Sequence, residues 1–427
     1  MKNNVIIRGF LCLLSLCLGF TACSLDQAPE NQTPGNETPG SETPGNETPG
    51  TETPGNETPG TETPGNETPG TETPENPKVV ASGQKILFLF PSEETLSYTI
   101  DPGLSTGERV KSWASSVPKT AGVQNGVVSA LAPGRAVITM TTMANIKSVW
   151  DVTVLDTDPP NLKTKFGVSA AGVAGVKATL DALHEYLPLL PDPSLLVKLG
   201  DYIDLDFSIP PIGDNDDYHA LSGGRALVVG VNPFLGKNGN DDTPHIALHF
   251  TTVYAIGRMN LTATNAGGYK ESAMRQYLLD HFLPALTSAG VTSDRIYAPK
   301  RYLWNAAAGA AGAADCIEDP VWLPTIYEIF GQDYIPVDYT ATGQIPLSIH
   351  EDAKNQIHLE YYDTPAQRRK PGLSGAGASW WLASPSLGKV EFDTNKFYET
   401  SVVGGQDSLT ALNPTNQYGV VPVFCVR

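Results

Sequence analysis

The sequence predicts a multidomain protein in which a disordered, Pro/Gly-rich stalk leads into an all-β sandwich, followed by an α+β domain. Residues 31–75 repeat one short polar unit and offer nothing apolar to bury. After Pro77, short strand-like runs alternate with turn residues, which is typical of an all-β domain. Beyond residue 161, apolar residues recur at helical spacing between further strand-like runs, which favours an α+β domain.

The first 22 residues have the three parts of an export signal. Lys2 and Arg8 stand before an apolar stretch that is shorter than the roughly 20 residues a transmembrane helix needs. Thr21 and Ala22 then lead directly into Cys23, an order that resembles the lipobox of bacterial lipoproteins. The resemblance implies cleavage before Cys23, lipid on its sulfur and a place in the bacterial cell envelope, at the outer membrane or cell surface. The alternative is an ordinary secretory signal cut at a small-x-small site.

The stalk is predicted over residues 23–78, where the unit (Asn/Ser/Thr)-Glu-Thr-Pro-Gly repeats. Proline at every fifth position forbids a helix, and the glycine beside it prevents a stiff polyproline rod. Residues 24–78 carry 11 carboxylates and one lysine, so they supply −10 of the formal net charge of −18. An acidic chain repels phosphate backbones, which argues against nucleic acid as a partner. The expected partners are a membrane, through the lipid, and a protein or glycan ligand.

The all-β sandwich is assigned to residues 79–156. The runs that carry a family resemblance there are Val110-Lys-Ser-Trp113, Gly126-Val127-Val128-Ser129-Ala130-Leu131, Pro133-Gly134-Arg135-Ala136-Val137-Ile138-Thr139 and Val152-Thr153-Val154. Together they resemble the group 2 bacterial immunoglobulin-like domain, which implies a β-sandwich used as a spacer or as an adhesive module. Trp113 is then expected between the two sheets, while Val137 and Ile138 are expected on opposite faces of one strand.

The α+β domain is assigned to residues 161–427, with an opening helical segment at 161–200 and a motif-bearing core at 226–427. Helices are predicted at 170–187 and 271–283 from apolar residues at helical spacing. Strands are predicted at 225–231 and 245–256 from short apolar runs. The residues that define the first helix are Val173, Val176, Leu180, Leu183 and Leu187.

Several segments of this domain carry a second family resemblance. They are Arg258-Met259-Asn260 with Thr264-Asn265-Ala266-Gly267-Gly268-Tyr269, Ser272-Ala273-Met274-Arg275-Gln276-Tyr277-Leu278, Val321-Trp322-Leu323-Pro324-Thr325 with Glu328, and Trp380-Trp381-Leu382-Ala383-Ser384-Pro385 closing at Gly419-Val420-Val421-Pro422-Val423-Phe424-Cys425. These segments resemble a domain-of-unknown-function family of bacterial surface lipoproteins and phage-associated proteins. In outline they are also similar to C-type-lectin-like folds, including the formylglycine-generating branch.

The lectin-like outline implies that residues 386–418 loop out as a ligand surface. The polar residues expected on that surface are Lys389, Asp393, Asn395, Lys396, Tyr398, Gln406, Asp407, Asn413 and Asn416. Of the adjacent Trp380 and Trp381, one is expected to face the core and the other the opposite side of a strand. Trp322 is expected in the core.

Two carboxylate-rich loops are candidates for calcium, which takes hard oxygen ligands. Their acidic residues are Asp214, Asp216, Asp241 and Asp242. Neither loop has a twelve-residue spacing with a distal glutamate, so solvated turns are the main expectation and no cofactor is predicted unless calcium binds there. His245 and His249 point the same way in a strand, but without a nearby third ligand they do not predict a zinc site.

Two cysteines remain beyond the signal peptide and the lipidated residue, Cys316 and Cys425. Export permits a disulfide between them, and two thiols that never meet are an equal alternative. A formylglycine-generating activity would need a pair of active-site cysteines, which the sequence does not place together.

These features favour a cell-surface lipoprotein that displays a lectin-like domain for adhesion or recognition. The alternatives are an envelope enzyme of formylglycine-generating outline and a structural envelope protein without a soluble ligand. No catalytic residue is assigned from the sequence, and whether the chain is an enzyme stays open.

Overall fold

The computed structural model describes most of the chain after the predicted stalk. The described residues are 79–90, 95–105, 107–209, 219–220, 222–304, 314–331, 357–368, 370–371, 379–385, 392–398 and 406–427. They fall in the second of two units, Glu72–Arg427, and their regular structure is mostly β. The signal peptide, Cys23 and the stalk lie outside the described residues, so those expectations stay predictions.

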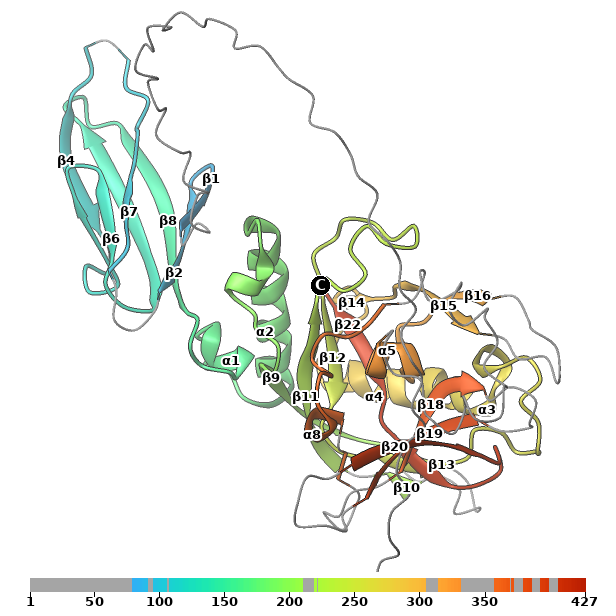
Figure 1. The fold of residues 1–427 in the computed structure, drawn as a ribbon. Helices are drawn as coiled ribbons and strands as arrows, with labels where there is room; N and C mark the ends of the chain where they lie inside the picture. The colour runs from blue at the N-terminus through green and yellow to red at the C-terminus, as the bar shows by residue number, and fades with distance from the viewer. Residues whose placement is uncertain are drawn as a thin grey trace, which may run out of the picture. The chain divides into compact units, whose positions relative to one another are not determined.

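The first part of the described chain forms two sheets (Figure 1). One has five strands in the order β1-β2-β8-β7-β4, and the other has three in the order β3-β6-β5. Strand β2 pairs parallel with β8, and the other pairs are antiparallel. The strands are β1 (Val79–Ser82), β2 (Lys85–Phe90), β3 (Ser97–Thr99), β4 (Val110–Ser115), β5 (Ala121–Gln124), β6 (Val127–Ala130), β7 (Gly134–Thr142) and β8 (Lys147–Asp156).

The two sheets share one apolar core, so they form a sandwich. Phe88 and Ile138 of the larger sheet and Val128 of the smaller one are buried in that core. Along β7, Ile138 is buried whereas Val137 is 36% exposed, which confirms the expected alternation. Trp113 is half-buried and packs against the core, with its ring 5.7 Å from that of Trp150.

Next comes a helical segment made of α1 (Leu162–Lys165), α2 (Gly172–Tyr186), η1 (Leu187–Leu189) and η2 (Pro193–Leu195). The helix predicted at 170–187 is confirmed. Val176, Leu180 and Leu183 are buried, as their spacing predicts. Val173 is 49% exposed, so it does not belong to the packed face. Asn161 caps α1 through its side-chain oxygen, which accepts hydrogen bonds from Lys163 N and Thr164 N.

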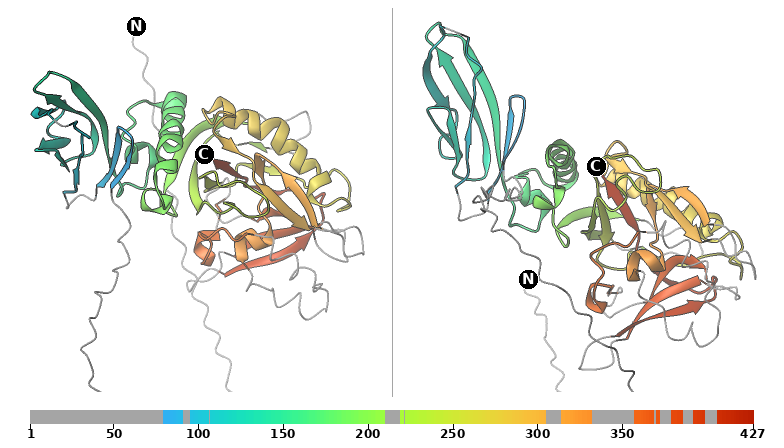
Figure 2. Two further views of the ribbon diagram at one scale, coloured as in Figure 1. Left: turned by 90° about the horizontal axis from the view of Figure 1, so that it is seen from above. Right: turned by 45° about the horizontal axis from the view of Figure 1, so that its top comes forward.

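The remaining chain is built around two six-stranded sheets (Figure 2). The first has the order β14-β22-β12-β11-β9, with β17 also paired to β22, and the second has the order β10-β13-β21-β18-β19-β20. A separate hairpin joins β15 and β16. The strands are β9 (Tyr202–Ser208), β10 (His219–Ala220), β11 (Ser222–Val231), β12 (Ile246–Phe250), β13 (Ala255–Gly257), β14 (Ile296–Tyr297), β15 (Lys300–Trp304), β16 (Ala314–Glu318), β17 (Val321–Trp322), β18 (Trp380–Pro385), β19 (Phe392–Tyr398), β20 (Gln406–Leu412), β21 (Tyr418–Val420) and β22 (Val423–Val426).

Short helices lie between these strands. They are η3 (Tyr269–Glu271), α3 (Ala273–Tyr277), the π-helical turn η4 (Leu278–Phe282), α4 (Leu283–Ser288), α5 (Ile326–Phe330) and α8 (Pro365–Arg368). The helix predicted at 271–283 therefore starts at the Ser272 cap and continues past Pro284. Proline lacks an N–H and its ring clashes with the preceding turn, and the wider π-turn before Pro284 accommodates both effects.

Two predictions about strands need correction. The run at 245–256 splits into β12 and β13, which belong to different sheets. Trp380 and Trp381 are both buried, so neither faces solvent. Strand β18 lies inside its sheet between β21 and β19, and the indole N–H of Trp381 donates to Gly257 O at 2.8 Å. Trp322 is fully buried, as expected.

Within the described part of the chain, no helix has the length and apolar character needed to cross a membrane.

We expect Ile138→Ala to lower the local free energy of unfolding of β7 by about 2–5 kcal/mol, because it leaves a cavity in the shared core. The neighbouring Val137→Ala, on the exposed face, should change it by less than about 0.5 kcal/mol. Amide hydrogen exchange of β7 in the full chain measures both values. Equal losses in the two variants would contradict this assignment of faces.

Candidate functional site

The motif at 321–328 is organised around a buried ion pair. The Arg301 guanidinium donates to both carboxylate oxygens of Glu328, at 2.7 Å each. Glu328 also accepts a hydrogen bond from Thr325 N at 2.8 Å, while Thr325 Oγ1 accepts one from Glu328 N, which completes a capping box at the start of α5. The guanidinium lies 4.5 Å from the centre of the Trp322 ring. These contacts stabilise the fold, and Arg301, Thr325 and Glu328 also line a small cavity of about 10 Å³.

A second ion pair ties the motif at 272–278 to the same region. Arg275 binds the buried carboxylate of Asp319 through Nε and Nη2, the latter at 2.8 Å. These hydrogen bonds raise the pKa of Arg275. Ser272 caps α3, and the buried Tyr269 hydroxyl accepts a hydrogen bond from Leu323 N at 3.1 Å. Asn260 also contacts the start of this helix, because its Oδ1 accepts a hydrogen bond from Ala273 N at 3.0 Å.

His245 and His249 are fully buried and each is held by hydrogen bonds. Since Phe234 N donates to His245 Nε2, the His245 Nδ1–H must donate to Thr243 O, at 2.8 Å. His249 Nε2 donates to Val421 O at 2.9 Å, and its Nδ1 contacts the Tyr362 hydroxyl. Burial lowers the pKa of both rings, so both are neutral core histidines.

The buried side chain of Lys370 lies close to His249. Lys370 Nζ donates to Phe250 O at 2.6 Å and lies 5.6 Å from the centre of the Tyr362 ring. Burial lowers the pKa of Lys370 to about 7, and the nearby positive charge helps to lower that of His249. Lys370 is not among the residues predicted from the sequence, because nothing in its local pattern indicates burial.

The two cysteines are free thiols in very different environments. Cys425 is buried in β22, where burial raises its pKa, and Cys316 is exposed on β16. The structure therefore has the unpaired arrangement, one of the two alternatives left open by the sequence. A pair of active-site cysteines is not assembled, which removes the main residues considered for formylglycine-generating chemistry.

The calcium candidates are only partly described. Asp214 and Asp216 lie outside the described residues. Asp241 accepts a hydrogen bond from Thr243 N at 3.1 Å, and its interactions with Thr243 hold its pKa below the usual value. Asp242 lies in the same turn, beside Gly236. Among the residues that the structure describes, no three His, Cys, Asp or Glu side chains lie close enough together to hold a metal ion.

The predicted ligand surface at 386–418 contains a β-hairpin. Asp393, Asn395, Lys396 and Tyr398 lie on β19, which pairs antiparallel with β20, the strand that carries Gln406 and Asp407. The side chains on these two strands, and Lys389, lie outside the described residues. Asn413 and Asn416 are exposed in the turn that follows. Asn413 Oδ1 accepts hydrogen bonds from Thr415 N and Oγ1, at 3.0 and 2.7 Å. Two segments of the predicted loop at 386–418, β19 and β20, are thus strands of the second six-stranded sheet.

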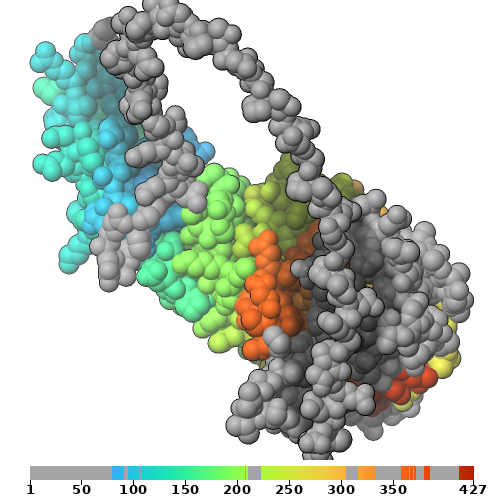
Figure 3. Space-filling model, in the orientation of Figure 1, coloured from blue at the N-terminus to red at the C-terminus, as the bar shows by residue number. Residues whose placement is uncertain are grey.

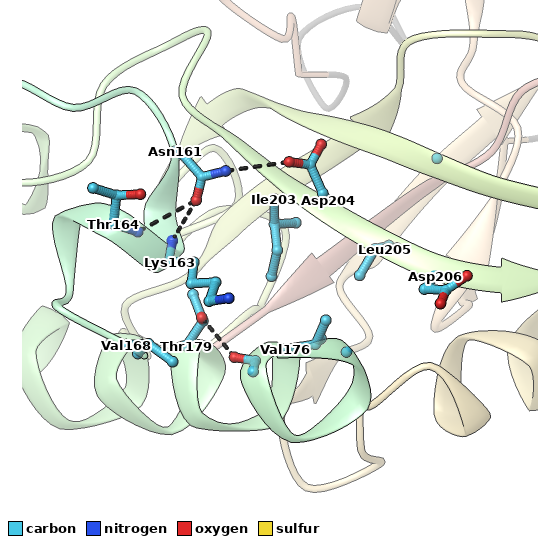
Figure 4. Close-up of a pocket in the computed structure, with 13 residues that line it drawn as sticks. Asn161, Lys163, Thr164, Val168, Val176, Thr179, Ile203, Asp204, Leu205 and Asp206 are labelled. Atoms are coloured by element: carbon cyan, nitrogen blue, oxygen red, sulfur yellow. Dashed lines mark hydrogen bonds between the residues drawn. The ribbon is translucent and has the colours of Figure 1, made fainter. Parts of the chain in front are cut away.

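An open groove lies between the helical segment and the edge of the first six-stranded sheet (Figure 4). Its volume is about 720 Å³, within the range of ligand-binding pockets. One wall comes from α1 and the first half of α2, and the other from β9 with Gly224 of the adjacent strand β11. The lining residues are Asn161, Lys163, Thr164, Val168, Gly172, Gly175, Val176, Thr179, Ile203, Asp204, Leu205, Asp206 and Gly224. Part of the helical segment that forms the wall is seen as green surface in Figure 3.

The groove combines an apolar base with charged walls. Ile203, Leu205 and Val176 are buried, whereas Asp204 and Asp206 are exposed on the strand. Asp204 is partly neutralised, because Arg225 Nε donates to it at 2.8 Å and Asn161 Nδ2 at 3.2 Å. Lys163 extends along the helical wall. Its Cε lies 3.6 Å from the position that a Cβ atom would take if residue 175 were not glycine. The alternation in residues 202–206 predicts a strand, but it does not reveal that the strand lies at a sheet edge beside a helix.

We expect Glu328→Ala to lower the free energy of unfolding by about 3–5 kcal/mol, because it leaves the buried Arg301 without its counter-charge. Glu318→Ala removes an exposed carboxylate and should have little effect. Urea unfolding of the full chain measures both. Similar curves for the two variants would contradict a structural role for Glu328.

The low pKa of Lys370 gives a pH dependence of known sign. An unfolded lysine titrates near its usual value of 10.5, so between pH 7 and 10.5 the unfolded chain binds more protons than the folded chain. Stability should therefore increase as the pH rises through this window. Lys370→Met should remove this increase, whereas the exposed Lys237→Met should keep it. Urea unfolding at several pH values measures the free energy of unfolding of each protein. A parallel change with pH in wild type and Lys370→Met would contradict the assignment.

Residues 248–427 match the model of a family described only as a domain of unknown function, DUF6273. A search of curated proteins found no match to the chain, and neither did a search of solved structures. The family match begins within β12, later than the core predicted from residue 226. It covers the Arg301–Glu328 and Arg275–Asp319 pairs but none of the residues that line the groove. The chain thus contains a DUF6273 domain at its C-terminal side.

Proposed function

We propose that the chain is a lipid-anchored binding protein of the bacterial envelope, which presents residues 161–427 to a protein or glycan ligand at the outer membrane or cell surface. The observation that carries this proposal is the groove between α2 and β9. It is open, of suitable volume, and lined by apolar, amide, hydroxyl and charged side chains. Binding needs no cofactor in this proposal.

The order of segments along the chain supports display. A lipobox-like sequence at Cys23 would attach two or three acyl chains, which hold a protein far more firmly than one. The polar repeat that follows would then act as a spacer, and the sandwich would carry the binding region further outward. The lectin-like outline of residues 226–427 belongs to the same proposal, with the β19–β20 hairpin as a second surface available to a ligand.

An enzymatic role has less support. The two cysteines needed for the formylglycine-generating outline are placed in different environments, one exposed and one buried. His249, Tyr362 and Lys370 are at most 2% exposed, and Tyr362 contacts both of the other two.

Two experiments test display and binding: antibody labelling of cells that carry the chain, and capture of ligands by the full chain. An antibody against the C-terminal domain should label intact cells, and external protease should remove the signal. The full chain should also retain a protein or glycan from host or matrix extracts that a stalk-only control does not retain. Full protection from protease, with nothing captured, would favour a structural envelope protein. Loss of capture upon chelation would assign calcium to one of the acidic loops.

We expect Cys23→Ala to release the chain from membranes, because the thioether-linked lipid can no longer form. In a detergent phase-separation experiment, the wild-type chain should partition into the detergent phase and the variant into the aqueous phase. Cys316→Ala provides the matched control and should behave as wild type. Equal partitioning of Cys23→Ala and wild type would favour the ordinary secretory signal instead.

A further inference from the structure

The turn between β7 and β8 exposes two large apolar side chains. Met143 is 66% exposed and Ile146 is 55% exposed, and neither belongs to the core of the sandwich. Hairpin turns favour Gly, Asn, Asp and Ser, which adopt positive φ or hydrogen-bond to the turn backbone. Asn145, with a φ of 63°, is the residue of this type in the turn. Met143 and Ile146 therefore serve neither the turn geometry nor the core.

The backbone of this turn is fixed by hydrogen bonds. Thr142 is buried, its N donates to Ile146 O at 2.9 Å, and its O accepts from Asn145 N at 2.9 Å. Met143 N donates to Arg109 O, directly before β4, at 2.8 Å. Both apolar side chains are thus held outward by an ordered backbone, so contact with a surface costs little additional backbone entropy.

Three exposed cationic side chains adjoin the apolar pair. They are Arg109, Lys111 and Lys147. The Nζ of Lys111 donates to Asn145 Oδ1 at 2.9 Å, which places its ammonium group at the turn. Glu108 is the carboxylate next to them along the chain. The turn thus combines exposed apolar groups with a local excess of positive charge.

This combination matches the surface of a bilayer that contains anionic lipids. Apolar side chains enter the boundary between headgroups and acyl chains, and Lys or Arg near the surface is attracted to the anionic headgroups. A polar glycan would leave the two apolar side chains without matching groups. A lipid surface therefore accounts for both features of the turn.

Both connections of the sandwich lie at the opposite end from this turn. Strand β8 begins at Lys147, beside the turn, and ends at Asp156, from which the chain continues to α1. Val79, the first residue of β1, pairs with Phe88, which pairs with Val154 near the end of β8. Lys147 and Val154 are separated by roughly 23 Å of extended strand. The Debye length is about 8 Å at physiological ionic strength, so negative charge where the predicted stalk joins Val79 is screened from the turn.

We propose that the turn between β7 and β8 binds the surface of a bilayer that contains anionic lipids, with Met143 and Ile146 in the headgroup region. Arg109, Lys111 and Lys147 contact the lipid phosphates in this arrangement. The inference goes beyond the proposed function, because it assigns a lipid surface to the sandwich, whereas the protein or glycan ligand belongs to the domain that follows. With two apolar side chains and three cations, the contact is weak, reversible and sensitive to salt.

Co-sedimentation with vesicles tests this contact. The chain from residue 24 onward retains the whole unit Glu72–Arg427. It lacks the predicted signal peptide and the predicted lipid attachment site, so neither contributes to binding. Vesicles of phosphatidylcholine and phosphatidylglycerol in equal parts are compared with vesicles of phosphatidylcholine alone.

Two double variants change the turn, and two single variants are matched controls. Met143→Ser with Ile146→Ser removes the apolar pair, and Lys111→Gln with Lys147→Gln removes two of the cations. Leu261→Ser removes another exposed apolar side chain, which is 65% exposed and lies outside the sandwich. Lys119→Gln removes an exposed cation at the other end of the sandwich, where the neighbouring Thr120 packs against Gly134 at the start of β7.

We expect the chain to sediment with the anionic vesicles, and each double variant to bind them about tenfold more weakly. Both controls should bind as the unsubstituted chain does, and added salt should weaken binding. Neutral vesicles should bind less of the chain than anionic ones. In a second measurement, brominated lipids in the anionic vesicles should quench the added fluorescence of Met143→Trp. Thermal unfolding at the unsubstituted chain's temperature shows that the variants fold.

Absence of sedimentation above that of the chain without vesicles would overturn the inference. Equal binding by the unsubstituted chain and by Met143→Ser with Ile146→Ser would also overturn it, because the contact would then lie elsewhere. If that double variant lost a protein captured from extracts, and no vesicle bound the unsubstituted chain, the turn would belong to a protein partner instead. Capture through residues 161–427 is measured separately, so each of these results leaves the proposed binding function standing.

Discussion

Strand β22, at the C-terminal end of the chain, pairs with β12, β14 and β17. All four of its residues, Val423–Val426, are buried. Three of the five other strands of the first six-stranded sheet therefore pair directly with β22. The partner strand β12 lies far earlier in the sequence, so its pairing with β22 closes a long loop, which is costly in entropy and must be offset by extensive burial. The burial of Phe250, Phe424 and His249 at this junction provides that offset.

Buried charged groups connect the surrounding elements to this sheet. Arg301 with Glu328 and Arg275 with Asp319 join the segments that carry the family motifs. Such pairs cost desolvation, and the bidentate hydrogen bonds between each guanidinium and its carboxylate offset part of that cost. Among the described residues, Arg301 Nη1 is buried without a hydrogen-bond partner. Their main effect is to specify how the segments are joined. The segments singled out from the sequence thus contact one another through buried ion pairs and hydrogen bonds.

A third buried ion pair positions the groove. Lys165 of α1 contacts Asp201, directly before β9, at 2.8 Å, and its Nζ also donates to Leu196 O and Thr157 O. Burial lowers the pKa of Lys165, and the carboxylate of Asp201 opposes that effect. The pair connects the helical segment to the start of β9, next to the isolated bridge between Asn161 and Tyr202. Lys165 and Asp201 thereby connect the two elements, α1 and β9, that contribute residues to the walls of the groove.

Periodicity and turn chemistry were sufficient to predict several local elements from the sequence alone. They predicted the alternating faces of β7, the helix α2 and the buried position of Trp322, because each depends on contacts whose spacing is visible over a few residues. The sequence also determined the acidic repeat and the absence of an apolar run of transmembrane length after residue 22. The tertiary structure alone decided that Trp380 and Trp381 are both buried, that His245 and His249 are core residues, and that β9 borders a groove. These outcomes depend on which distant segments cover each face or edge, and such pairings leave no mark on the local pattern of side chains.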